Sequence, residues 1–255
     1  LDYLIKVEGV KFVDAVLALC EKSPSYIPPP SQPEQKKEFA LSPAAANNRR
    51  VFAYLMKRGI SRKVIEACVR AEILYESADY HNAVFVGKDE TGTARYAFLR
   101  GTYTKGKPFK AEVSGSEKQY CFCLPPKGKT NRLAVYEAAI ETLAHLTLEG
   151  SADKWRLSLG GISAPKDGEP SRSFSFKKPL ALESFLGRHP EIEELEICTN
   201  NDFAGRWAAT CLEKAYQGRY RIVKNLPEKE GCDYADLTKE RYEKQAARQR
   251  ATCSR

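Results

Sequence analysis

Two stretches of this chain share one design, in which an apolar strand-like run ends in acidic or amide side chains. The first run, residues 132–137, ends in Glu137. The second run, residues 195–199, is followed directly by Asn200 and Asp202, after which a helical pattern begins. Open α/β sheets bind ligands at the carboxyl ends of their strands. The repeated design therefore predicts one ligand site that two strand ends share.

Strand and helix patterns alternate from residue 132 onward. The expected strands cover residues 132–137, 155–159, 195–199 and 220–223, and the expected helices cover residues 139–148, 180–188 and 204–216. Such alternation predicts a mostly parallel sheet with helices on both faces.

The part of the chain before residue 128 has a different pattern. A helical hairpin is expected over residues 47–71, with Gly59 as the break and Ser61 as the N-cap of its second helix. Strand patterns follow over residues 83–87, 94–100, 107–113 and 119–124. These patterns predict a small α+β subdomain. The expected divisions of the chain are an apolar helix over residues 1–22, a Pro-rich linker over 23–46, this subdomain over 47–128, the α/β domain over 129–238 and a basic helix or tail over 239–255.

The formal net charge of +8 is concentrated in the first half of the chain. Residues 1–128 carry 20 Lys and Arg but only 14 Asp and Glu. The segment 95–129 contains eight basic residues, and its only acidic residues are Glu112 and Glu117. A surface of this kind suits a nucleic acid or a nucleotide. A solvated basic surface is the alternative that composition leaves open.

The sequence also restricts the compartment and the metal chemistry. It contains no run of about 18 apolar residues, so no membrane span is expected. None of the eight cysteines forms a C-x-x-C pair, and no secretory signal accompanies them. We therefore expect reduced thiols, a cytoplasmic location and no zinc site within these residues.

Glu137, Asn200 and Asp202 are the candidate metal ligands. Adjacent strand ends lie about 5 Å apart, so side chains distant in sequence can share an ion. Mg²⁺ prefers oxygen ligands and is commonly held by one or two carboxylates together with phosphates and waters. Asp233, in the acidic segment 233–236, could add a third carboxylate. The alternative is that all three carboxylates serve helices instead of a metal. Asp202 would cap a helix, and Glu137 and Asp233 would lie at helix N-termini, where the helix dipole favours negative charge.

The second half of the chain resembles a Toprim (topoisomerase–primase) domain in the order and spacing of four segments: residues 136–141 (YEAAIE), 159–161 (LGG), 200–206 (NNDFAGR) and 233–236 (DYAD). In that family a strand-tip Glu and a later Asp-x-Asp hold Mg²⁺ for phosphoryl transfer. The resemblance implies that Glu137 and Asp202 are catalytic and bind the metal, with Asp233 as a further ligand. Asn200 aligns with the first Asp of the motif, and Ala138 stands where a Gly often follows the Glu.

The first half resembles the basic N-terminal subdomain of bacterial replicative primases, through residues 53–61, 83–92, 99–101 and 110–118. The resemblance implies that phosphates are contacted by Arg100, Lys107, Lys110 and Lys118. It is strongest to Toprim-containing, primase-like proteins of plasmids and transposons, which often carry a domain of unknown function at this place. Residues 1–22 resemble the closing helix of a primase zinc-binding module, and the resemblance places zinc only in that module, upstream of these residues.

Together these features imply a Toprim, Rossmann-like α/β sheet preceded by a small basic α+β subdomain. The implied function is a primase-like nucleotidyltransferase that uses Mg²⁺ or Mn²⁺, nucleoside triphosphates and single-stranded DNA in the replication or transfer of a mobile element. A replicative helicase or a relaxase is a candidate partner. Asn200 and Ala138 favour an alternative, a non-catalytic DNA-binding accessory protein. A metal-dependent nuclease is a third hypothesis, whereas the lack of a motif-placed Tyr nucleophile disfavours a topoisomerase.

Overall fold

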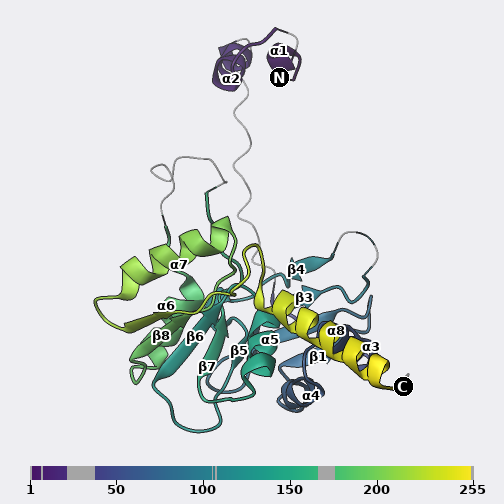
Figure 1. The fold of residues 1–255 in the computed structure, drawn as a ribbon. Helices are drawn as coiled ribbons and strands as arrows, with labels where there is room; N and C mark the ends of the chain where they lie inside the picture. The colour runs from purple at the N-terminus through teal and green to yellow at the C-terminus, as the bar shows by residue number, and fades with distance from the viewer. Residues whose placement is uncertain are drawn as a thin grey trace. The chain divides into compact units, whose positions relative to one another are not determined.

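A five-stranded sheet carries the strand–helix alternation of the second half (Figure 1). The computed structural model describes residues 2–6, 8–21, 38–104, 106, 108–165 and 176–253. Four strands of the sheet run parallel, and one short edge strand is antiparallel to its neighbour. In sheet order they are β5 (Cys123–Leu124, antiparallel), β7 (Trp155–Ser158), β6 (Arg132–Tyr136), β8 (Glu194–Ile197) and β9 (Arg221–Lys224). The predicted mostly parallel sheet is confirmed.

Helices cover both faces of this sheet because its strands are apolar on both sides. On one face, α6 (Leu180–Arg188) and α7 (Phe203–Tyr216) pack against Leu133 and Val135 of β6. On the other face, α5 (Ala139–Glu149) and α8 (Tyr234–Cys253) pack against Ala134 and Tyr136. Gly150 ends α5 in the left-handed conformation, with φ +71°, as its C-cap.

A second sheet of four antiparallel strands makes up the upstream part. Its order is β1 (Leu74–Glu76), β2 (Ala83–Lys88), β3 (Ala94–Arg100) and β4 (Lys110–Glu112). The expected helical hairpin is present as α3 (Arg49–Lys57) and α4 (Arg62–Arg70). Ala83 and Phe85 of β2 share one apolar core with α3, α4 and α5, so this core holds the two sheets together.

The expectation of a strand over residues 119–124 is wrong. A 3₁₀ helix, η1 (Lys118–Tyr120), comes first, and only β5 at the end of the segment is a strand, in the five-stranded sheet. The segment crosses from one sheet to the other, and the Tyr120 carbonyl lies so close to Gly87 that a Cβ there would be 1.6 Å from its oxygen. Arg188 of α6 fixes the crossing, because it donates to the Gln119 carbonyl (3.3 Å) and covers the Tyr120 ring. Strand β1 was not predicted.

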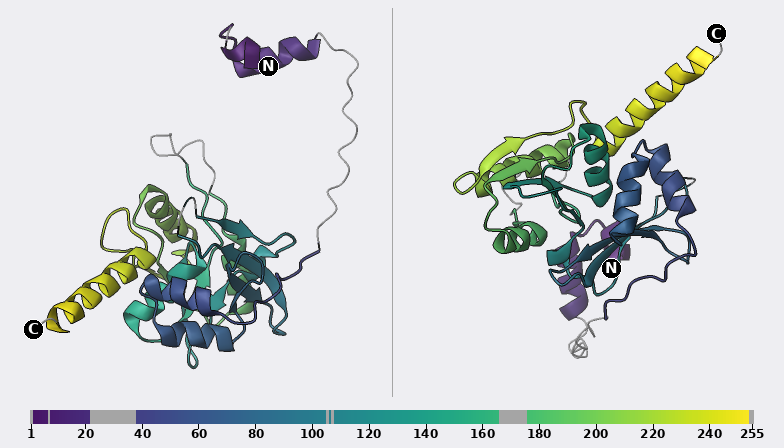
Figure 2. Two further views of the ribbon diagram at one scale, coloured as in Figure 1. Left: turned by 90° about the vertical axis from the view of Figure 1, so that its right-hand side faces the viewer. Right: turned by 90° about the horizontal axis from the view of Figure 1, so that it is seen from below.

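The chain divides into two compact units, Leu1–Lys37 and Glu38–Arg255. The first unit contains α1 (Asp2–Lys6) and α2 (Phe12–Glu21), which pack together. Most of the expected linker over residues 23–46, namely residues 23–37, lies outside the described residues. Within the second unit, the distal part of α8 extends away from both sheets (Figure 2). Among the helices that the structure describes, none is long and apolar enough to span a bilayer.

Candidate functional site

The ends of β6 and β8 lie side by side, because these strands pair in parallel with Val135 opposite Ile197. Glu137 directly follows β6, and Asn200 follows β8. Glu137 reaches across and accepts a hydrogen bond at Oε1 from the backbone N–H of Asn200, with an N···O distance of 3.1 Å. The sequence predicted that these two strand ends share one site, and in the structure the Glu137 carboxylate joins them.

Asp202 and Asp233 flank this carboxylate, and each caps a helix. Asp202 is exposed, and its Oδ1 accepts from the N–H of Gly205 (2.7 Å) at the start of α7. The Oδ1 of Asp233 accepts from the N–H of Asp236 (2.7 Å) at the start of α8. Asp202 thus has the capping role that was its alternative, and Asp233 lies at a helix N-terminus, as its own alternative had it. A cap uses one carboxylate oxygen, so this role is compatible with a metal contact through the second oxygen.

Glu141 is a further carboxylate at this site, and it was not among the predicted site residues. It is buried, and its Oε2 accepts from the backbone N–H groups of Glu137 (3.1 Å) and Ala138 (3.2 Å). Glu141 therefore fixes the turn that presents Glu137. A Glu three positions after the N-cap is the spacing of a capping box, and this signal could have found it.

The carboxylates repel one another in a half-buried setting. Burial is the largest cause that raises the pKa of Glu137 above its usual value, and the negative charges of Asp202 and Asp233 add to it. Burial likewise raises the pKa of Asp233, and it raises the pKa of Glu141 strongly. A divalent cation would relieve this repulsion. All the donors are carboxylate or amide oxygens, so the residues fit Mg²⁺ or Mn²⁺.

A basic wall faces the acidic strand ends across a cavity of about 240 Å³ between the two sheets. Its cations are Arg58 after α3, Arg100 at the end of β3 and Lys110 at the start of β4, and the cavity is also lined by Glu137 and Asp233. Within the described part of the chain, none of these three cations lies within ion-pairing distance of a carboxylate. Cations without such partners are suited to bind phosphate. Arg58 was not among the predicted site residues, although it stands in the segment that carries the primase resemblance.

The other two predicted phosphate contacts are not brought to this cavity by the structure. Lys118 pairs with Glu112 (3.4 Å) and lines a separate cavity of about 650 Å³, which Lys177 and Lys178 also border. Lys107 lies outside the described residues. Of the predicted basic residues, Arg100 and Lys110 are the ones that face the carboxylates.

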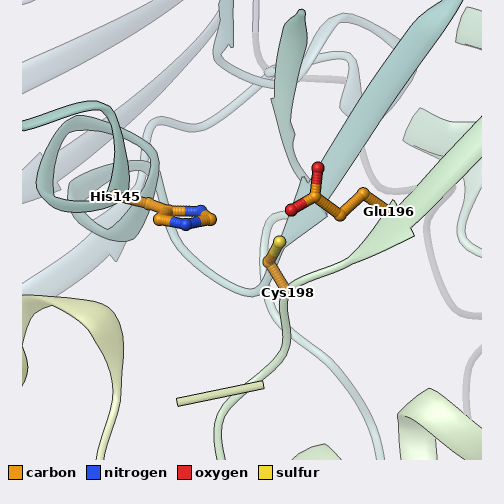
Figure 3. A group of neighbouring side chains, drawn as sticks. All are labelled: His145, Glu196 and Cys198. Carbon is orange, nitrogen blue, oxygen red and sulfur yellow. The ribbon is translucent and has the colours of Figure 1, made fainter. Parts of the chain in front are cut away.

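A second group of potential metal ligands lies inside the domain, on the α5 side of the sheet. His145, Glu196 and Cys198 point toward one another there, with their donor atoms all within 4.8 Å (Figure 3). Glu196 and His145 already have hydrogen-bonding partners in the protein. Lys154 Nζ (2.5 Å) and Asn225 Nδ2 (2.6 Å) bind Glu196.

The remaining contacts of this group also argue against a cation. The Tyr136 hydroxyl bonds His145 Nδ1 (2.8 Å), and burial raises the pKa of Cys198 well above its usual value, which keeps the thiol neutral. Glu149 pairs with both Lys154 and Arg156, so two cations already balance the two carboxylates, Glu149 and Glu196. We therefore interpret this group as a structural polar network.

A model of a protein family described as a protein of unknown function (DUF3991) matches residues 53–129. The match falls where the resemblance to primase-like proteins implied a domain of unknown function. No curated protein matches the chain.

Solved primase structures share the fold. The primase fragment of the bacteriophage T7 primase-helicase protein is 18% identical, with a TM-score of 0.52 over 90% of this chain and 85% of that chain. The Aquifex aeolicus primase (zinc-binding and RNA polymerase domains) is 15% identical, with a TM-score of 0.51 over 96% of this chain and 68% of that chain. A DnaG primase catalytic domain bound to ssDNA is 18% identical, with a TM-score of 0.47 over 75% and 69%. The chain has the mixed α/β fold of primase catalytic cores.

Proposed function

We propose that this chain is a primase-like nucleotidyltransferase that acts on single-stranded DNA with nucleoside triphosphates. The observation that carries the proposal is the cavity between the two sheets, where the Glu137 and Asp233 carboxylates face Arg58, Arg100 and Lys110. Opposed acidic and basic walls suit a ligand that brings both phosphates and divalent cations. The primase-core fold supports the same class of reaction.

Glu137, Asp202 and Asp233 would hold the metal, with the side-chain oxygen of Asn200 as a neutral ligand. When bound, Mg²⁺ or Mn²⁺ would neutralise triphosphate charge and orient the reacting groups. In the reaction, the 3′ hydroxyl oxygen of one nucleotide bonds to the α-phosphorus of the next, and pyrophosphate leaves.

The protein's own residues would supply binding and orientation. Arg58 and Arg100 would bind phosphate oxygens through their planar guanidinium groups, and Lys110 would act as a point charge. Glu141 would keep the turn after β6 in place, because it binds the N–H groups of Glu137 and Ala138. The mobile-element setting of the reaction rests on the sequence resemblance alone.

Asn200 favours a second candidate function, a non-catalytic DNA-binding protein. An amide in place of a carboxylate removes one negative charge from the candidate metal site, and hard cations are held largely by carboxylate charge. This hypothesis predicts DNA binding that depends on salt but not on Mg²⁺.

Extension of an RNA primer on a single-stranded DNA template tests the proposal, since a supplied primer makes the assay independent of template capture. We expect Mg²⁺-dependent incorporation of nucleotides that falls by more than about 100-fold in Glu137→Gln and Asp202→Asn, because changes at metal sites commonly cost 10–100-fold even in outer-shell residues. The affinity for single-stranded DNA should stay within about twofold, since the basic wall supplies it. Cleavage without nucleotides would favour the nuclease instead, and DNA binding with neither activity would favour the non-catalytic protein.

A further inference from the structure

Tyr54 of α3 contacts both guanidinium groups of the basic wall. The Nε of Arg100 donates a hydrogen bond to the Tyr54 hydroxyl (3.2 Å). The Cζ of Arg58 lies over the Tyr54 ring, 5.0 Å from its centroid, which is a cation–π geometry. The phenol itself is 6% exposed and belongs to the core between the sheets. One buried side chain therefore holds two cations that come from different elements.

The backbone of Arg58 is fixed independently of its side chain. The next residue, Gly59, has φ +80°, and a Cβ there would lie 2.3 Å from the carbonyl oxygen of Thr238 in α8. Arg58 follows Tyr54 by four positions, which places the two side chains on the same side of the helix. The ring of Tyr54 then determines where the guanidinium lies.

Both arginines need a positioning contact. An Arg side chain carries about 2 kcal/mol of rotamer entropy, so an unheld guanidinium is spread over many orientations. Among the described residues no carboxylate pairs with Arg58 or Arg100, and the two like charges repel each other. The hydroxyl oxygen and the negative ring face of Tyr54 offer each cation a separate, weakly negative contact without neutralising it.

We propose that Tyr54 is a positioning residue that holds Arg58 and Arg100 so that they bind the same phosphate-bearing ligand in the cavity. The inference rests on the proposed function, because it takes the ligand to be a phosphate compound. The phosphate belongs either to a nucleoside triphosphate or to the backbone of single-stranded DNA. The alternative role for Tyr54 is that of a packing residue of the core.

Double-mutant cycles separate these two roles, with dissociation constants measured for ATP plus Mg²⁺ and for a fluorescent oligo-dT. Tyr54→Phe keeps the ring and its packing but removes the hydroxyl. We expect it to weaken binding about 5- to 10-fold, the scale of one typical intramolecular hydrogen bond. In Arg100→Gln the same change should have almost no further effect, because Arg100 is the partner of the hydroxyl. The ligand that shows this coupling is the one whose phosphate the pair binds.

Arg58 supplies the matched comparison. Tyr54→Phe and Arg58→Gln should weaken binding additively, because Phe preserves the ring face, whereas Tyr54→Leu and Arg58→Gln should be strongly non-additive. If Tyr54 only packs the core, the losses of affinity should be additive in every cycle, and that result would replace the positioning role by a packing role. If the wild-type protein binds both ligands but shows no coupling, the positioning role is wrong and the proposed function stands. If the wild-type protein binds neither ligand, the proposed function itself is contradicted.

Discussion

Glu137 and Asn200 are joined across the ends of β6 and β8 by a hydrogen bond of 3.1 Å, from the Asn200 N–H to Glu137 Oε1. The contact fixes a carboxylate in a half-buried position beside Asp202 and Asp233, whose charges help to raise its pKa. The ionised Glu137 is therefore less stable in the folded chain than in the unfolded one. Sites built for a cation commonly carry such a cost while the cation is absent.

Glu137→Gln should stabilise the metal-free protein at pH 8, by about 0.5–2 kcal/mol, the usual range for stabilising substitutions. The pKa of Glu137 in the folded chain is raised above the unfolded value of 4.5. Between these two pKa values the folded chain binds more protons than the unfolded chain, so stability falls as the pH rises from 4.5 through the folded-state pKa. The difference from wild type should shrink as the pH falls toward 4.5. Urea denaturation with EDTA measures it, and the exposed Glu228→Gln serves as control. Equal stability of Glu137→Gln and wild type at pH 8 would contradict the argument.

Gly205 is required where the turn after β8 meets α7. A Cβ at this position would lie 2.0 Å from the Asn200 carbonyl oxygen, so Gly205→Ala must displace the turn that carries Asn200 and Asp202. We expect a loss of about 1–3 kcal/mol of stability, as for overpacked cores, together with weaker Mn²⁺ binding. Gly187 in α6 has nothing within 4 Å of the same atom. Gly187→Ala should be neutral or stabilising by up to about 1 kcal/mol, and thermal unfolding compares the two.

On the α5 side of the sheet, Lys154 pairs with two carboxylates. Its Nζ lies 2.7 Å from Glu149 Oε1 and 2.5 Å from Glu196 Oε2. Lys154→Met should cost about 3–5 kcal/mol, since it removes the nearest cation from the buried Glu196 and leaves it only Arg132, at 3.7 Å. Combining it with Glu196→Leu should cost less than the single change. The exposed pair of Lys244 with Glu240 offers a control, in which Lys244→Met should cost no more than about 0.5 kcal/mol. Chemical denaturation measures the free energy of unfolding of each variant. A double variant that is less stable than Lys154→Met would contradict the prediction that the two side chains compensate each other's charge.

His145 should make stability fall in mild acid. Burial lowers its pKa from 6.5 to about 4, so between these values the unfolded chain takes up a proton that the folded chain does not. The stability lost by pH 4 approaches about 3 kcal/mol. His145→Gln should flatten the pH dependence between 6.5 and 4. Urea denaturation across this range measures it, and a variant that keeps the wild-type slope would contradict the prediction.

The sequence predicted the layers of the fold and the strand ends of the site, because both depend on local periodicity. Glu137 meets the backbone of Asn200, since parallel strands bring their carboxyl ends to one edge of a sheet. That their side chains share an ion stays a prediction. Glu141 was missed because its role lies in two backbone hydrogen bonds, and a Glu on a helix is ordinarily read as solvent-facing. Arg58 was missed because its place beside the cavity goes with contacts that local pattern does not show, the close approach of Gly59 to Thr238 and the contact of the guanidinium with the Tyr54 ring.

The failures share a physical cause, which is that tertiary contacts override local pattern. Residues 119–124 alternate like a strand, yet Arg188 and the close approach to Gly87 divide them between η1 and β5. Lys118 was among the predicted phosphate contacts, but it pairs with Glu112 and does not line the cavity that contains Glu137 and Asp233. Charge composition identifies the type of surface, and only the fold decides which cations face the site.

Titration of Mn²⁺ in the presence of ATP, followed by electron paramagnetic resonance, shows whether the strand-end carboxylates bind a cation although Asn200 contributes no charge. We expect site-dependent binding in wild type, a loss of about tenfold or more in Asp202→Asn, and tighter binding in Asn200→Asp, since each step changes one ligand charge. Equal Mn²⁺ affinity in all three proteins, or binding that appears only in Asn200→Asp, would contradict the account and favour a DNA-binding protein without metal chemistry.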